Sequence, residues 1–183
     1  MENIRYRMKI DDQPGMLDLV LEHVKTSDYG AHPIVMIYYY LNLIVREPDD
    51  TQNYVKVKKV FFDNEEDLHL FDAINIYINL ENYLWKLYRR GITEYKDELF
   101  ELYRRRLKKD KYKLGGFMPN QIYKRVVRVA LMNGDAVFAD KFIKKYKGEL
   151  NPEFKTGVYN FACSLCSFHK MDYGKALEYL AIA

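Results

Sequence analysis

Residues 133–146 read NGDAVFADKFIKKY and residues 170–183 read KMDYGKALEYLAIA, and these two stretches decide the fold. They align when Asp135 is placed on Asp172, which sets a period of 37 residues. A fixed period of this length is typical of repeats built from a helix, a tight turn and a second helix. The alignment therefore predicts an all-α fold of stacked antiparallel helical hairpins.

Small residues recur at matching places in the two stretches. Ala139 falls on Ala176, and in the preceding segments Ala130 falls on Ser167. Where two helices cross closely, alanine or serine lets the backbones approach while larger neighbours fill the sides. We therefore expect Ala139 and Ala176 to be buried at contacts between helices.

Helical periodicity continues upstream of these repeats, whereas the alternation typical of strands is scarce. Prolines, glycines and capping residues divide the chain into about eight or nine helices with short connections. One boundary signal is Asn64 followed by three acidic residues, which predicts the start of a helix that runs to about Arg90. The expected helices lie within residues 16–24, 33–47, 51–63, 65–90, 94–113, 119–132, 136–147, 152–170 and 173–183.

The chain is expected to form a single helical-repeat domain over residues 1–183, because no shift in composition marks a boundary. Residues 1–14 are a lead-in, residues 15–113 are irregular helical hairpins, and residues 118–183 are the two regular repeats.

The C-terminal stretch resembles the turn and second helix of a tetratricopeptide repeat. The matching residues are Asp172 and Tyr173 in the turn and Ala176, Leu180 and Ala183 at the small, large and small positions. The first helices lack the usual aromatic and glycine around Asn160 and Ser164. The overall pattern is also similar to large uncharacterised bacterial helical-repeat proteins. The resemblance implies an α-solenoid with an extended surface for a protein or peptide partner.

The last expected helix ends on Ala181, Ile182 and Ala183, without a capping residue or a polar outer face. A terminal repeat of a solenoid normally needs such a polar face for solubility. We therefore expect either that the chain is a segment of a longer array or that another copy covers this end by self-association.

The composition indicates a folded chain with no membrane-spanning segment. Hydrophobic residues make up 49% of the chain, enough for a core, yet no apolar run reaches the roughly 18 residues of a membrane span. Two cysteines are too few for a disulfide scaffold, and the N-terminal stretch lacks the apolar region of a signal peptide. These features favour a cytoplasmic protein.

Charge is distributed unevenly along the sequence. Residues 1–91 carry a net charge of −4, whereas residues 92–183 carry +7. Much of the excess is the basic tract, residues 104–113, which includes Tyr112. Cations bind phosphates and tyrosines stack on bases, so this segment is a candidate for nucleic-acid binding. The competing interpretation is a solvated helical surface.

Two functions therefore remain open. The first is a non-enzymatic scaffold for a protein or peptide, and the alternative is nucleic-acid binding through residues 104–128. In the apolar stripe of residues 34–45, Tyr38 is expected to face the core. Tyr39 and Tyr40 are expected either to line a groove that binds a partner or to act as wedges between helical hairpins. The candidate partner-binding residues are Arg104, Arg105, Lys108, Tyr112, Lys124, Arg125, Arg128, Tyr39 and Tyr40.

Chemistry by a metal or a catalytic group is not expected. Cys163, Cys166 and His169 share roughly one helix face, but a structural zinc site takes four ligands and no second pair occurs. A redox C-x-x-C motif opens a helix after a strand, whereas this one lies within a helix. No combination of nucleophile, base and orienting group can be assembled from motifs. We therefore predict no enzyme activity, no metal and no cofactor.

Overall fold

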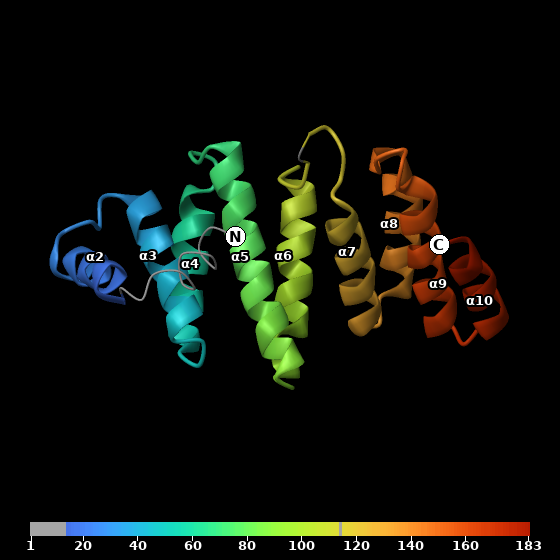
Figure 1. Ribbon diagram of the computed structural model, residues 1–183, viewed down its shortest axis with the longest axis horizontal. Coiled ribbons are helices and arrows are strands. Elements are labelled where there is room, and N and C mark those ends of the chain that lie inside the picture. Colours follow the sequence, from blue (N-terminus) through green and yellow to red (C-terminus); the bar gives the residue numbers. More distant parts are fainter. Residues whose placement is uncertain (1–13, 114) are drawn as a thin grey trace. The chain divides into compact units, whose positions relative to one another are not determined.

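The computed structural model describes residues 14–113 and 115–183, and every regular element in them is a helix (Figure 1). These residues form nine α-helices, which confirms the prediction of an all-α fold with eight or nine helices. The chain divides into two compact units between His69 and Leu70, each with its own packing. The predicted lead-in lies outside the described residues, apart from Pro14, which begins the first helix.

The first unit is built around the helix that begins at Pro33. Its helices are α2 (Pro14–Thr26), α3 (Pro33–Arg46) and α4 (Thr51–Asn64). α3 packs against α2 and α4 through Ile37, Leu41 and Ile44, which share one face at the i, i+4, i+7 spacing. Asp50 caps α4, because its carboxylate accepts the Gln52 N–H at 3.0 Å.

The helix start predicted at Asn64 is wrong. Asn64 is the last residue of α4, and its amide Nδ2 donates back to the Val60 carbonyl at 2.8 Å. Glu65, expected in the first turn of the next helix, is buried instead. The preference of anions for a helix N-terminus is worth only about 0.3–1 kcal/mol, which tertiary packing readily outweighs.

The second unit is a succession of packed helices. They are α5 (Leu70–Arg89), α6 (Lys96–Lys108), α7 (Asn120–Met132), α8 (Ala136–Tyr146), α9 (Lys155–His169) and α10 (Tyr173–Ile182), with 3₁₀ turns η1 (Thr93–Tyr95) and η2 (Lys147–Glu149). Each α-helix packs on the next, and α7 also contacts α9 directly. α5 is buried on most sides, in keeping with the apolar residues that occur on most of its faces.

The turns between α7 and α8 and between α9 and α10 are equivalent in their hydrogen bonds. The Phe138 N–H donates to Asp135 at 2.8 Å, and the Lys175 N–H donates to Asp172 at 3.2 Å. The N–H of each aspartate donates to the carbonyl five residues earlier, at 2.9 Å in both turns. The expected burial of the small residues is also observed, since Ala139 is 0% exposed and Ala176 is 8% exposed.

One pair of equivalent turn residues has the same left-handed backbone conformation, although one residue is a glycine and the other a methionine. Gly134 has a φ of +75°, and Met171, one period later, has a φ of +62°. The left-handed region costs a non-glycine residue roughly 1–2 kcal/mol, so Gly134 is relaxed and Met171 is strained.

We expect opposite effects from exchanging the residue types in these turns. Gly134→Met should lower the free energy of unfolding by about 1 kcal/mol, because it places a side chain in the left-handed region. Met171→Gly should raise it by about 0.5 kcal/mol, because relief of strain exceeds the added entropy of the unfolded chain. Urea titration measures both, and effects of the same sign would contradict the equivalence.

Candidate functional site

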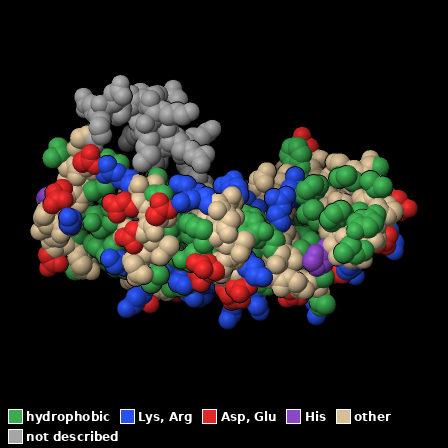
Figure 2. All heavy atoms as spheres, turned by 90° about the horizontal axis from the view of Figure 1, so that it is seen from below, with side chains coloured by type: hydrophobic (Ala, Val, Ile, Leu, Met, Phe, Trp, Pro, Cys, Tyr) green, Lys and Arg blue, Asp and Glu red, His purple; other side chains and the backbone are tan. Residues whose placement is uncertain are grey.

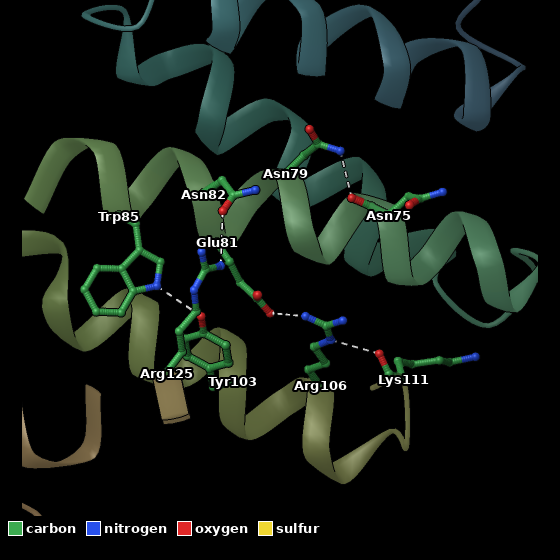
Figure 3. A network of polar contacts seen from close by, with 9 residues as sticks. All are labelled: Asn75, Asn79, Glu81, Asn82, Trp85, Tyr103, Arg106, Lys111 and Arg125. Atoms are coloured by element: carbon green, nitrogen blue, oxygen red, sulfur yellow. Dashed lines mark hydrogen bonds and ion pairs between the residues drawn. The ribbon is translucent and has the colours of Figure 1, made fainter. Parts of the chain in front are cut away.

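The basic tract is not a continuous cationic surface, because Arg106 points into the core. Its Nη1 donates to Glu81 Oε1 of α5 at 2.7 Å, and its Nε donates to the Lys111 carbonyl at 2.9 Å (Figure 3). The side chains of Glu81 and Arg106 are 0% and 1% exposed. This arginine therefore holds α5 against α6 and is not available to a ligand.

The ion pair belongs to a larger polar network inside the second unit. The Trp85 indole N–H donates to the Tyr103 hydroxyl at 3.0 Å, beside the pair (Figure 3). Burial raises the pKa of the Glu81 carboxyl, and the charges of Arg106 and Arg125 oppose this rise. Burial and the nearby Glu81 also raise the pKa of the Tyr103 hydroxyl, which keeps it a hydrogen-bonded phenol.

Other cations of the tract have acidic or aromatic neighbours. Arg104 pairs with Glu101 at 3.1 Å and lies over the Phe100 ring. Lys113 lies 3.4 Å from Glu149. Lys108 is exposed at the end of α6, and Arg105 is half-buried. The outer surface of this segment therefore combines both signs of charge.

The tyrosine of the basic tract, which was a candidate for stacking on a ligand, is buried. Tyr112 is 3% exposed, and its hydroxyl donates to Glu149 Oε2 at 2.8 Å. Tyr103 and Tyr123 are buried too, the latter donating to the Ile143 carbonyl at 2.7 Å. The interpretation of Tyr112 as a contact residue is therefore corrected, because its ring is core and only exposed rings can stack on bases.

The tyrosines of α3 lie differently from the prediction. Tyr38, expected on the core side, is exposed. Tyr39 and Tyr40 are half-buried, with their rings in an edge contact at 5.2 Å between centroids. Lys56 of α4 lies over the Tyr40 ring at 5.8 Å. Tyr39 and Tyr40 thus take part in packing within the first unit.

A polar contact joins α5 to α7, and it involves one of the three predicted cations of α7. We call the surface around it the amide–cation surface and define it as Asn75, Asn79 and Asn82 of α5 with Lys124, Arg125 and Arg128 of α7. The asparagines follow the i, i+4, i+7 spacing of one helix face. Arg125 Nη1 donates to Asn82 Oδ1 at 3.2 Å across the two helices (Figure 3). Side-chain amides can both donate to and accept from a peptide backbone.

Residues of α7, of α9 with the turn before it, and of α10 line an open hollow of about 560 Å³, and Lys124 belongs both to this hollow and to the amide–cation surface. Phe154 and Phe161 provide aromatic surface, and Lys124 lies over the Phe161 ring with its ammonium 5.2 Å from the centroid. The lining residues are Asn120, Lys124, Glu153, Phe154, Gly157, Val158, Phe161, Leu180 and Ala183. Sequence reasoning named Lys124 but missed both phenylalanines. The 37-residue period places Phe161 at the position that Lys124 occupies one repeat earlier, which was the one available signal for Phe161, and no signal marked Phe154.

The two cysteines lie inside α9, as predicted, and both are free thiols. Burial raises the pKa of Cys166 to about 12, and burial also raises the pKa of Cys163. Within the described residues, no three potential metal-ligating side chains come together. The environment is that of small residues filling a helix contact.

These pKa values predict slow thiol chemistry in the folded chain. In Cys163→Ser, which isolates Cys166, labelling by iodoacetamide at pH 8 should be at least about 100-fold slower in the native state than in urea, because little thiolate is present. Mass spectrometry of timed samples measures the rates. Rapid labelling of the native variant would instead indicate a reactive, open thiol.

Comparison with known proteins assigns no family. No protein-family profile matches the chain, and no curated protein matches it in sequence. Among the helices in the described ranges, none combines the length and apolar character needed to cross a bilayer.

Proposed function

We propose that the chain is a non-enzymatic, cytoplasmic helical-repeat scaffold that binds a protein or peptide partner. The observation that carries this proposal is the hollow between α7, α9 and α10, which adjoins the amide–cation surface. The two turns with identical hydrogen bonds support a tetratricopeptide-like arrangement of these helices.

The lining of the hollow favours an apolar anchor next to negative charge. The rings of Phe154 and Phe161 offer contact area to an apolar side chain. Lys124 lines this hollow and Arg128 is exposed on the same helix, and both cations attract carboxylates. We infer that the preferred ligand is an extended peptide in which a large apolar residue is flanked by acidic residues.

A binding titration tests this proposal. The probe is a fluorescein-labelled peptide with a central leucine flanked by glutamates, followed by fluorescence anisotropy. We expect Phe161→Ala and Lys124→Glu each to weaken binding by about tenfold or more, as loss of a central contact does. The matched control is Lys141→Glu, an exposed charge reversal on α8 outside this hollow, which should change affinity by less than about threefold.

Two results would overturn the proposal. One is no measurable binding of the acidic peptide, and the other is equal loss of affinity in the control and the hollow variants. A labelled single-stranded oligonucleotide provides the contrasting arm. Oligonucleotide binding that falls steeply with salt and disappears in Arg104→Glu/Lys108→Glu would favour nucleic-acid binding through residues 104–128 instead.

A further inference from the structure

Two helices of the second unit carry cations on neighbouring faces. α5 and α7 run in the same direction, because their connections to α6 lie at its opposite ends (Figure 1). Their faces meet where Arg125 donates to Asn82. One turn beyond this contact, at the i+4 and i+3 positions, lie Lys86 on α5 and Arg128 on α7. The two helices therefore present these cations at the same level.

These cations belong to a row that has no acidic partner. We define the cation row as Lys86 and Arg89 of α5 with Lys124 and Arg128 of α7. Lys124 is half-buried and the other three are exposed. Among residues 14–113 and 115–183, no carboxylate forms an ion pair with any of the four. α7 contains no acidic residue, and α5 contains only Asp72 in its first turn and the buried Glu81. The row is thus free to attract an external anion, unlike the basic tract.

The cation row starts at the hollow and leads away from it on one side. Lys124 lines the hollow, Arg128 lies one turn further along α7, and Lys86 lies across on α5. The lining also includes the exposed Glu153, which belongs to the turn before α9. On the face that Figure 2 shows, hydrophobic side chains gather over α9 and α10, whereas lysine and arginine side chains are visible over α5 to α7. A negatively charged ligand segment is therefore attracted towards α5 and repelled beside α9.

We propose that the ligand of the hollow is asymmetric, with all its acidic residues on one side of the apolar anchor, where they follow the cation row from α7 to α5. This inference rests on the proposed function and specifies which peptide the site selects. Four residues of helix span about 6 Å, neighbouring helix axes lie roughly 10 Å apart, and an extended chain advances about 3.3 Å per residue. An acidic residue about two positions from the anchor thus reaches Arg128, and one about five positions away reaches Lys86.

Three fluorescein-labelled peptides test the asymmetry by fluorescence anisotropy. Two of them carry about six glutamates, either all before or all after a leucine anchor, with serines elsewhere, and one order should bind at least about tenfold tighter. The third peptide keeps the tighter-binding order but only the roughly three glutamates nearest the anchor. Arg128→Glu should weaken the tighter long peptide and the short peptide by about tenfold each. Lys86→Glu should weaken the long peptide by about fivefold and leave the short one within about twofold.

Lys141→Glu, a charge reversal on α8 outside the cation row, is the matched control and should change each affinity by less than about threefold. Binding that depends on Phe161 but not on the order of the glutamates would leave the proposed function standing and overturn only this inference. Equal effects of Lys86→Glu and Lys141→Glu on the long peptide would overturn it too. A single-stranded oligonucleotide that binds and is lost in Lys86→Glu, while no peptide binds, would assign the cation row to nucleic acid instead.

Discussion

Arg106→Met is expected to lower the free energy of unfolding by about 3–5 kcal/mol, because it leaves the Glu81 carboxylate buried without its charge partner. Both side chains are almost fully enclosed, so water cannot replace the lost guanidinium. The matched control is Arg104→Met, two residues earlier on the exposed side of α6. That change should stay within about 0.5 kcal/mol, as surface ion pairs contribute little.

The double variant Glu81→Met/Arg106→Met should recover most of the stability that Arg106→Met loses. Glu81 Oε2 and Arg106 Nη2 are buried and have no hydrogen-bond partner among the described residues, so the pair is incompletely satisfied. Replacing such a pair by apolar residues of similar volume is often neutral or stabilising. The ion pair therefore contributes less to stability than the loss caused by breaking it.

Tryptophan fluorescence in urea is a suitable measurement for these variants. Trp85 is the only tryptophan of the chain, and its indole is hydrogen-bonded to Tyr103 inside the same network. Its emission therefore reports unfolding of the second unit. Glu81→Met alone completes the set of variants. If the double variant lost as much stability as the sum of the losses in Arg106→Met and Glu81→Met, the two side chains would not be coupled and the assignment of a buried ion pair would fail.

The burial of Arg106 could be predicted from its position in the sequence, although not from the composition of the basic tract. Leu99, Leu102, Tyr103 and Arg106 follow the i, i+3, i+4, i+7 spacing, so the arginine lies on the apolar stripe of α6. A count of the cations in the basic tract treats Arg106 like its exposed neighbours, whereas a helical wheel places it on the apolar face. The identity of the partner, Glu81, depends on how α5 packs on α6 and is not encoded in either helix alone.

The repeats were the most predictable part of the chain, because turn chemistry and helix packing there agree. Asp135 and Asp172 cap their helices, and the alanines four residues later are buried, as the 37-residue alignment requires. The predictions that Asn64 starts a helix and that Tyr112 contacts a ligand were wrong for the same reason. A capping signal and a tyrosine beside lysines are local preferences, and long-range burial outweighs both.

The hollow was only partly predictable. Lys124 was a candidate because of its charge, but Phe154 and Phe161 had no distinguishing local feature. They line a cavity because α7, α9 and α10 meet around them, which is a property of the tertiary arrangement. Lys124 and Phe161 occupy equivalent positions in consecutive repeats. A search for site residues from the sequence can therefore start from a candidate such as Lys124 and examine the equivalent position in the next repeat.

Ala139→Leu is expected to lower the free energy of unfolding by about 1–3 kcal/mol, because the added side chain must fit between α8 and its packed neighbours. Leucine and alanine have similar helix propensities, so the cost reports packing and not the helix itself. Phe142 and Ile143, which flank this position, are also buried and leave little room to adjust.

The equivalent substitution Ala176→Leu is the matched control, and it should cost less than about 1 kcal/mol. α10, which carries Ala176, packs mainly on α9, and the exposed Leu177 and Leu180 beside Ala176 can shift into solvent to accommodate a larger residue. Urea titrations of both variants at one low protein concentration compare the two positions. A small effect at Ala139 would mean that α8 does not approach its neighbours closely there. Because the alignment of the two repeats rests on that close approach, the explanation of the 37-residue period by helix packing would then have to be abandoned.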